Sequence, residues 1–244
     1  MESKKPVGLM CLLVTVISLA TLVYVTRDLT ERFLVERTTI EVKGYAEKKI
    51  VSDFAVWSGR FVVRHANMTD AYRMVEEDRA KVLEFLKKNG IDHSDVTFNP
   101  LSIYPQYKLS DTGASTNIVE SYEASLEFKV ASSDTDKIFK ISRDSNDLVG
   151  QGVQFSSFPP NFIYTKIDEV KVELLEEAAK DAYKRADHLA DSSEVALNKL
   201  KSIRQGVFQI TPEFNFDVSD SGYYDTTTIN KTVKAVVTAT YTIK

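Results

Sequence analysis

The sequence predicts an α+β protein in which mixed or antiparallel sheets pack with helices, preceded by one N-terminal transmembrane helix. Three observations lead to this fold class. Residues 7–25 form an uncharged run. Residues 233–243 alternate apolar and polar side chains as a half-buried strand does, and residues 168–190 carry apolar residues at helical spacing. Because hairpin-like strands and helices are interspersed along the chain, we expect helices stacked on sheet.

The uncharged run follows two lysines, Lys4 and Lys5. Its 19 residues, at ~1.5 Å each, just reach across a ~30 Å hydrocarbon core. The positive-inside bias then keeps the lysines in the cytoplasm and exports the rest. The expected location is therefore the inner (cytoplasmic) membrane, single-pass through residues 7–25, with the C-terminal domain in the periplasm or extracytoplasmic space.

A cleavable signal peptide is the competing interpretation of the same run. Residues 7–17 would be its apolar region, and Ser18-Leu19-Ala20 would offer a cleavage site. The anchor is preferred because apolar residues continue through Val25. The expected organisation is an anchor at 1–27, a spacer at 28–37 and one extracytoplasmic domain at 38–244.

Composition excludes several function classes. The only cysteine is Cys11, inside the apolar run, so the exported part has no disulfide, thiolate nucleophile or cysteine-based zinc site. The first 37 residues hold five basic and four acidic groups, so their net charge is +1. Because the whole chain has a net charge of −4, the remaining residues carry −5. A mildly acidic domain without a basic stripe argues against nucleic acid as a partner.

The first half of the domain is expected to hold two strands, a helix, a third strand and a loop. Their expected positions are 39–43, 53–64, 69–89, 95–107 and 110–117. The first two strands resemble a long hairpin that turns near 48–52. Thr69 or Asp70 is expected to cap the helix, which Asn89-Gly90 closes. Pro100 and Pro105 cannot donate ladder hydrogen bonds, so the third strand is expected at an edge or bulged.

The second half is expected to hold a strand, a short helix, a strand, a long helix, two strands and an intervening loop. The expected strands are 119–131, 151–157, 201–211 and 231–244, and the expected loop is 214–228. The short helix is expected at 135–147, and the long helix is expected to begin at Lys166 or Asp168 and to end at Ala190. Pro159-Pro160 marks a break. Several residues on one face of the long helix are alanines, which permit close packing on a sheet or on another subunit. A faint twofold repeat is visible, because each half holds a long helix followed by a strand.

No constellation in the sequence indicates catalysis. His65, His93 and His188 lack metal-ligand spacing, and no nucleophile elbow or phosphate-binding glycine loop occurs. We therefore predict no catalytic, cofactor-binding or metal-binding residues and no cofactor.

Tyrosines are the remaining candidate functional residues. Tyr104, Tyr107, Tyr223 and Tyr224 fall near expected loops and strand ends. Tyrosine suits surfaces that are half apolar and half wet, as at interfaces. These side chains are expected either in a core or subunit contact, or at the rim of a ligand site.

Several motifs, in order, resemble those of the SIMPL-domain family. They include Ile40-Glu-Val-Lys-Gly44-Tyr-Ala46, Ser52-Asp53-Phe-Ala55-Val-Trp57 and the alanine-rich stretch at 177–190. The resemblance covers about 38–244. Two departures stand out: Ser52 replaces a usual proline, and Ser193-Glu194 replaces the glycine that often follows the long helix.

The resemblance implies a bacterial, periplasmic or envelope-associated protein built from β-α-β units. At least one member of that family forms a large ring-like homo-oligomer, and some are linked to oxidative-stress tolerance. A mammalian member is reported to associate with a kinase of innate signalling. No catalytic residues are established for the family, so none can be carried over.

The leading hypothesis is thus a membrane-tethered, non-enzymatic envelope protein that self-associates as a homo-oligomer, with the identity of any other protein partner open. The alternative is a ligand- or peptide-binding module that uses the tyrosine-rich loops. An envelope hydrolase is a third hypothesis, which a tight cluster of histidine and carboxylates would support.

Overall fold

The computed structural model describes residues 14–27, 38–215 and 217–244. Besides a helix at 14–27, its elements are β1 (Thr39–Val51), β2 (Phe54–His65), α2 (Met68–Lys88), η1 (His93–Asp95), β3 (Val96–Phe98), β4 (Ser102–Leu109), β5 (Ser115–Ser132), α3 (Thr135–Asp144), α4 (Asp147–Gly150), β6 (Phe155–Ser157), β7 (Asn161–Ile163), α5 (Ile167–Ser192), β8 (Leu197–Gln205), β9 (Gln209–Pro212), β10 (Tyr223–Tyr224) and β11 (Asn230–Ile243). The α+β class is confirmed.

The predicted transmembrane segment falls partly outside these residues. Its part at 7–13 and the predicted spacer at 28–37 are not among them, whereas 14–27 is helical. Within the described chain, no helix combines the length and apolar character needed to cross a membrane.

The chain divides into two compact units. The first comprises the described residues up to Glu47 together with Val170–Phe208 and Lys234–Lys244. The second comprises Lys48–Glu169 and Gln209–Val233.

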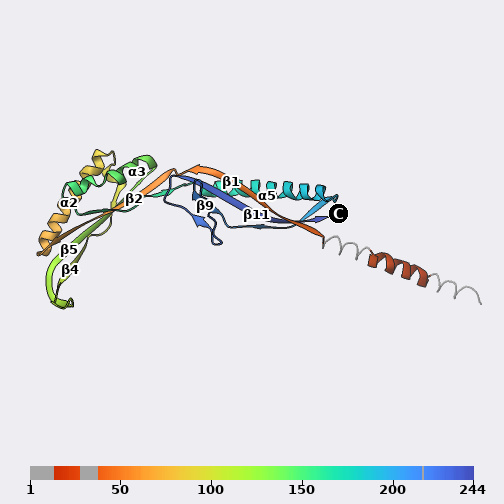
Figure 1. Ribbon diagram of the computed structural model, residues 1–244, viewed down its shortest axis with the longest axis horizontal. Coiled ribbons are helices and arrows are strands. Elements are labelled where there is room, and N and C mark those ends of the chain that lie inside the picture. The colour runs from red at the N-terminus through yellow and green to blue at the C-terminus, as the bar shows by residue number, and fades with distance from the viewer. Residues whose placement is uncertain (1–13, 28–37, 216) are drawn as a thin grey trace, which may run out of the picture. The chain divides into compact units, whose positions relative to one another are not determined.

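The second unit is built on a six-stranded sheet of order β3-β5-β2-β6, with β4 also paired to β5 and β7 to β2. Strands β2 and β5 pair antiparallel from Ala55↔Ser132 to His65↔Tyr122. Alternate residues of β2 are buried, because α2 and α3 cover one face of this sheet (Figure 1). The core under the helices contains Trp57 and Phe128, whose ring centroids lie 5.3 Å apart, edge to face.

Sequence periodicity predicted the buried face of β5 correctly. The alternation at 119–131 predicts one face made of Tyr122, Ala124, Leu126, Phe128 and Val130; the last four are buried and Tyr122 is half-buried. The C-terminal end of α2 is also confirmed, since Gly90 follows the helix with φ +76°.

The predicted N-cap of α2 was wrong by a few residues. The cap is Asn67, whose side-chain oxygen accepts from the Thr69 amide at 2.8 Å and from the Asp70 amide at 3.4 Å. Asn67 keeps extended backbone angles, so Thr69 and Asp70 already lie inside the first turn.

In the first unit, α5 lies along β1 and β11 (Figure 1). The face of α5 that carries Ala178, Ala182, Ala186 and Ala190 is fully buried within the single chain. A Cβ built on Gly44 of β1 would lie 2.0 Å from the Ala178 carbonyl oxygen. Of the two interpretations of the small-residue face, packing on the chain's own sheet is therefore the one the structure supports.

A hydrogen bond ties β1 to α5 beside this contact. The Tyr45 amide donates to the Asp181 carboxylate at 2.9 Å. This bond, aided by Arg185 at 2.7 Å, holds the pKa of Asp181 below its usual value. The family motif around Gly44 thus has a structural reason, because only glycine allows the strand and helix to approach so closely.

The expected hairpin between the first two strands was wrong. β1 pairs with β11, whereas β2 pairs with β5, β6 and β7, so the two lie in different sheets. The Ser52 amide donates to the Ile229 carbonyl at 2.9 Å, a bond that proline could not make. The Asp53 carboxylate accepts from the Thr165 amide and hydroxyl, both at 2.8 Å. These bonds hold the residue before β2 against the turn before α5.

Other boundaries moved where turns interrupt a pattern. The strand expected at 95–107 is two strands, β3 and β4, separated around Pro100. The loop expected at 110–117 is a tight turn with Gly113 at φ +80°, and β5 already begins at Ser115. The strand expected at 201–211 splits into β8 and β9, and β7 and β10 were not predicted.

The helix α5 ends without a glycine. Glu194 occupies the left-handed region with φ +56°, the conformation that glycine usually supplies after a helix. The Val195 amide donates to the Ala190 carbonyl at 3.1 Å, which satisfies one of the last carbonyls of the helix. The departure at this motif therefore preserves the helix ending but places a strained residue in it.

Candidate functional site

The four candidate tyrosines lie in two separate places of the second unit. Tyr104 and Tyr107 are on β4, which pairs with β5, whereas Tyr223 and Tyr224 form β10, which pairs with β9 of the other sheet. All four are exposed. The structure therefore keeps them out of the core and does not gather the two pairs on one sheet, and a ligand-binding role for them stays a prediction.

The first pair belongs to a projecting two-stranded ribbon, defined here as residues 102–109 of β4 and 115–121 of β5. Strand β2 pairs with β5 only as far as Tyr122, so among the described strands residues 115–121 have β4 as their one neighbour. Ile118 and Val119 are consecutive and exposed by 63% and 40%, because their side chains point to opposite faces of the ribbon.

The ribbon is unusual for its bare apolar surface. Tyr107 lies directly opposite Val119, and Leu109 at the end of β4 is 61% exposed. A two-stranded hairpin is only marginally stable in water without packing against further structure. An exposed, apolar strand edge is a template for pairing with another chain. The sequence signal was the adjacent Ile118-Val119 pair, which cannot be buried on one face.

An apolar hollow of about 410 Å³ lies elsewhere in the second unit. Phe139 of α3, Phe162 of β7 and Phe214 in the turn after β9 form its aromatic walls. Phe214 is 78% exposed and has φ +66°, a rare conformation for a bulky residue. The sequence does not indicate this hollow, because its three rings come from distant segments with no common spacing.

A buried ion pair supports one wall of the hollow. Lys231 Nζ lies 3.1 Å from Asp225 Oδ2, and the two side chains are only 2% and 1% exposed. Asp225 also accepts from the amides and hydroxyls of Thr227 and Thr228. These two threonines line the hollow together with Ile229.

The protonation of this pair follows from its contacts. Burial alone raises the pKa of the Asp225 carboxyl, but hydrogen bonds from Thr228, Thr227 and Lys231 outweigh it and lower that pKa to about 2. Burial lowers the pKa of Lys231, while the hydrogen bond to Asp225 and the charge of that carboxylate oppose the shift. At neutral pH the Asp225 carboxylate is ionised and accepts hydrogen bonds from Thr227, Thr228 and Lys231, which suits it to holding the 225–231 segment in place.

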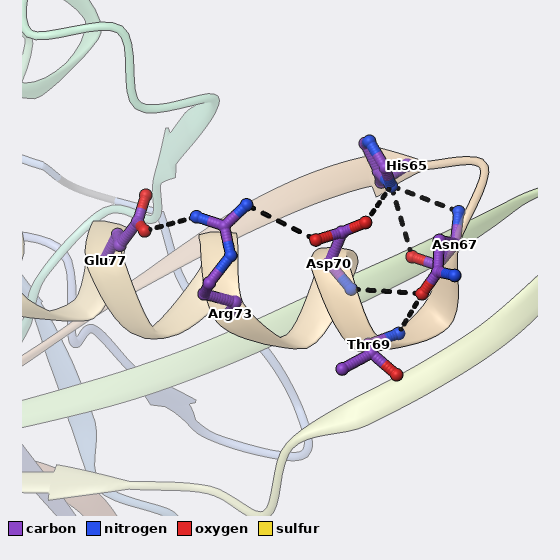
Figure 2. A network of polar contacts seen from close by, with 6 residues as sticks. All are labelled: His65, Asn67, Thr69, Asp70, Arg73 and Glu77. Carbon is purple, nitrogen blue, oxygen red and sulfur yellow. Dashed lines mark hydrogen bonds and ion pairs between the residues drawn. The ribbon is translucent and has the colours of Figure 1, made fainter.

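Histidine and carboxylates do meet at one place, the start of α2. Figure 2 shows His65 beside Asn67 and Asp70, with Arg73 and Glu77 further along the helix. The Asn67 amide donates to His65 Nδ1 at 3.1 Å, and Asp70 Oδ2 lies 3.7 Å from the same nitrogen. Arg73 bridges Asp70 at 3.4 Å and Glu77 at 2.6 Å.

The chemistry of this network is that of a helix cap. His65 Nδ1 also lies 3.3 Å from the Asn67 carbonyl oxygen, so the ring contacts both backbone groups of the residue that caps α2. The other ion pairs lie on an exposed helix surface, where each contributes little to stability. The network therefore orders the entry to α2.

The other two histidines belong to other elements than those that form this network. His93 is in η1 and His188 is on α5 of the first unit. In the described parts of the chain, no group of three or more His, Cys, Asp or Glu side chains is arranged to hold a metal ion.

Comparison with known proteins matches this chain to one family model and to one curated protein. The model described as "SIMPL: Protein of unknown function (DUF541)" matches residues 40–241. The chain is also 24% identical over 179 residues to the "Uncharacterized protein YggE" of Edwardsiella ictaluri (strain 93-146), with 71% of this chain and 70% of that protein covered. The matched range contains the Gly44 and Asp53 motifs and the alanine-rich helix α5.

Proposed function

Because the chain belongs to the SIMPL family, we propose that it is a membrane-tethered, non-enzymatic envelope protein whose extracytoplasmic part self-associates through the β4–β5 ribbon. The observation that carries the proposal is the ribbon's exposed edge at 115–121, whose only partner among the described strands is β4. A second copy of the chain can add a strand to this edge and cover Ile118 and Val119 in the same step.

A comparison of the chain's exposed strands favours this edge. β8 is exposed along most of its length, but it carries Lys199, Lys201 and Arg204, the charges that commonly protect an edge from pairing. On β4, Pro105 removes a backbone donor. Residues 115–121 of β5 contain neither proline, lysine nor arginine.

The oligomeric state tests the self-association. The full-length chain, purified in a mild detergent, should show a native mass of two or more copies by mass spectrometry and sedimentation. Ile118→Lys should raise the dissociation constant of the assembly by tenfold or more, because it places a charge on the covered edge. Val149→Lys is the matched control, since Val149 is 55% exposed on α4, away from the ribbon. A full-length chain that remains monomeric at high micromolar concentration contradicts the proposal.

The tether and its orientation have separate tests. A C-terminal alkaline phosphatase fusion should be active, because that enzyme needs an oxidising extracytoplasmic compartment. The protein should stay with membranes after alkaline extraction and should begin at or near Met1 by N-terminal sequencing. A mature chain beginning at Thr21 would instead support the cleavable signal peptide. A role in oxidative-stress tolerance predicts that a deletion strain is more sensitive to peroxide and is rescued by the wild-type gene.

A further inference from the structure

The hollow in the second unit has the size and lining of a small-molecule site. Its volume of about 410 Å³ falls within the usual range for ligand pockets. Phe139 and Phe162 line it with ring centroids 6.3 Å apart, and Ile229 adds an aliphatic wall. Such a lining binds an aliphatic or aromatic group by burial of apolar surface.

Cations lie against the two exposed rings of this hollow. The Arg143 guanidinium is 5.7 Å from the centroid of Phe139, and Lys49 Nζ is 5.1 Å from that of Phe214. Glu213, the carboxylate of the lining, pairs with Lys49 at 2.7 Å. Arg143 does not itself line the hollow but lies over Phe139, which does, and within the described residues no carboxylate lies at ion-pair distance from its guanidinium.

The wall formed by Phe214 is held in a costly conformation. An aromatic residue at φ +66° is strained by about 1 kcal/mol or more. Strain of this kind persists where the surrounding structure over-determines it, and it concentrates at ligand sites. Here the contact with Lys49 and the turn after β9 keep an exposed ring at the edge of the hollow.

We propose that this hollow binds an amphipathic anion, a carboxylate joined to an aliphatic or aromatic group. The apolar group lies between Phe139, Phe162 and Ile229, and the carboxylate faces Arg143. Arginine suits this role because its planar guanidinium can bind a carboxylate through two parallel hydrogen bonds. This site is separate from the ribbon and does not depend on self-association.

The test uses 4-phenylbutyrate and its neutral amide, titrated by calorimetry into the full-length chain in lipid nanodiscs. The acid should bind about tenfold more tightly than the amide, the size expected for one charge-assisted contact. Arg143→Gln should remove that preference. Phe214→Gly should lower the affinity for both compounds by tenfold or more. Because glycine adopts a positive φ without strain, we expect this variant to keep the fold.

Phe158→Ala is the matched control, because Phe158 is 41% exposed in the same unit and does not line the hollow. It should leave both affinities unchanged, and Trp57 fluorescence should confirm the fold of every variant. Absence of acid binding at millimolar concentration overturns the proposal. So does equal binding of acid and amide, or binding that Phe214→Gly and Arg143→Gln leave unaltered.

Discussion

Replacing Gly44 by alanine probes the contact that joins β1 to α5. An alanine Cβ at this position would lie 2.0 Å from the Ala178 oxygen, 2.6 Å from the Ala182 nitrogen and 2.7 Å from the Ala182 Cβ. Two of these neighbours are backbone atoms of a long helix, which cannot rotate away as a side chain can. The helix as a whole must therefore move.

The size of that movement sets the cost. Ordinary contact begins near 3.4 Å, so the 2.0 Å separation must grow by about 1.4 Å. Overpacking of this kind costs about 1–3 kcal/mol. The same displacement lengthens the 2.9 Å bond from Tyr45 to Asp181, and loss of a hydrogen bond to a charged group costs a further 1.5–3 kcal/mol or so. We expect Gly44→Ala to destabilise the first unit by about 3–5 kcal/mol.

Urea denaturation followed by circular dichroism at the helix band provides the assay, because this signal contains α5, which lies mostly in the first unit, together with α2 and α3 of the second. Trp57 fluorescence reports the second unit in the same samples. Gly150→Ala is the matched control, since nothing lies within 4 Å of a Cβ built there. If the free energy of unfolding of Gly44→Ala lies within about 0.5 kcal/mol of that of this control, the tight-contact argument is refuted.

Three further predictions concern strain and the buried ion pair. Glu194→Gly should stabilise the protein by about 0.5–1 kcal/mol in the same denaturation assay, because glycine adopts φ +56° without strain; a loss of stability would contradict this. Lys231→Met should destabilise the second unit by about 3 kcal/mol, since it leaves Asp225 buried and unpaired, and adding Asp225→Asn should recover part of the loss. The lowered pKa of Asp225 means that its stabilisation, about 2 kcal/mol, is complete above its unfolded value near 4 and is lost as pH falls through about 2. Acid titration of the Trp57 signal should show this loss in the wild type and a flatter profile in Asp225→Asn.

Local patterns in the sequence predicted the strands and helices in which buried residues recur at a fixed spacing. The alternation of β5 identified Ala124 and Phe128 as core residues, and helical spacing identified most of the buried face of α5. Leu189 was also expected on that face, but it is 50% exposed and Ala190 is buried instead. These predictions succeed because a strand or helix that covers one face must place apolar residues at a fixed period. The family motifs also followed from local sequence, although their reason, such as the contact at Gly44, did not.

The sequence alone therefore determined the fold class, the family and most of the buried faces. Tertiary structure decided which strands pair, that the alanine face of α5 packs on β1, and that Phe139, Phe162 and Phe214 surround one hollow. It also decided that residues 115–121 pair with β4 alone among the described strands. The physical reason is that periodicity records whether a residue is buried, whereas pairing and convergence depend on contacts between segments far apart in the chain.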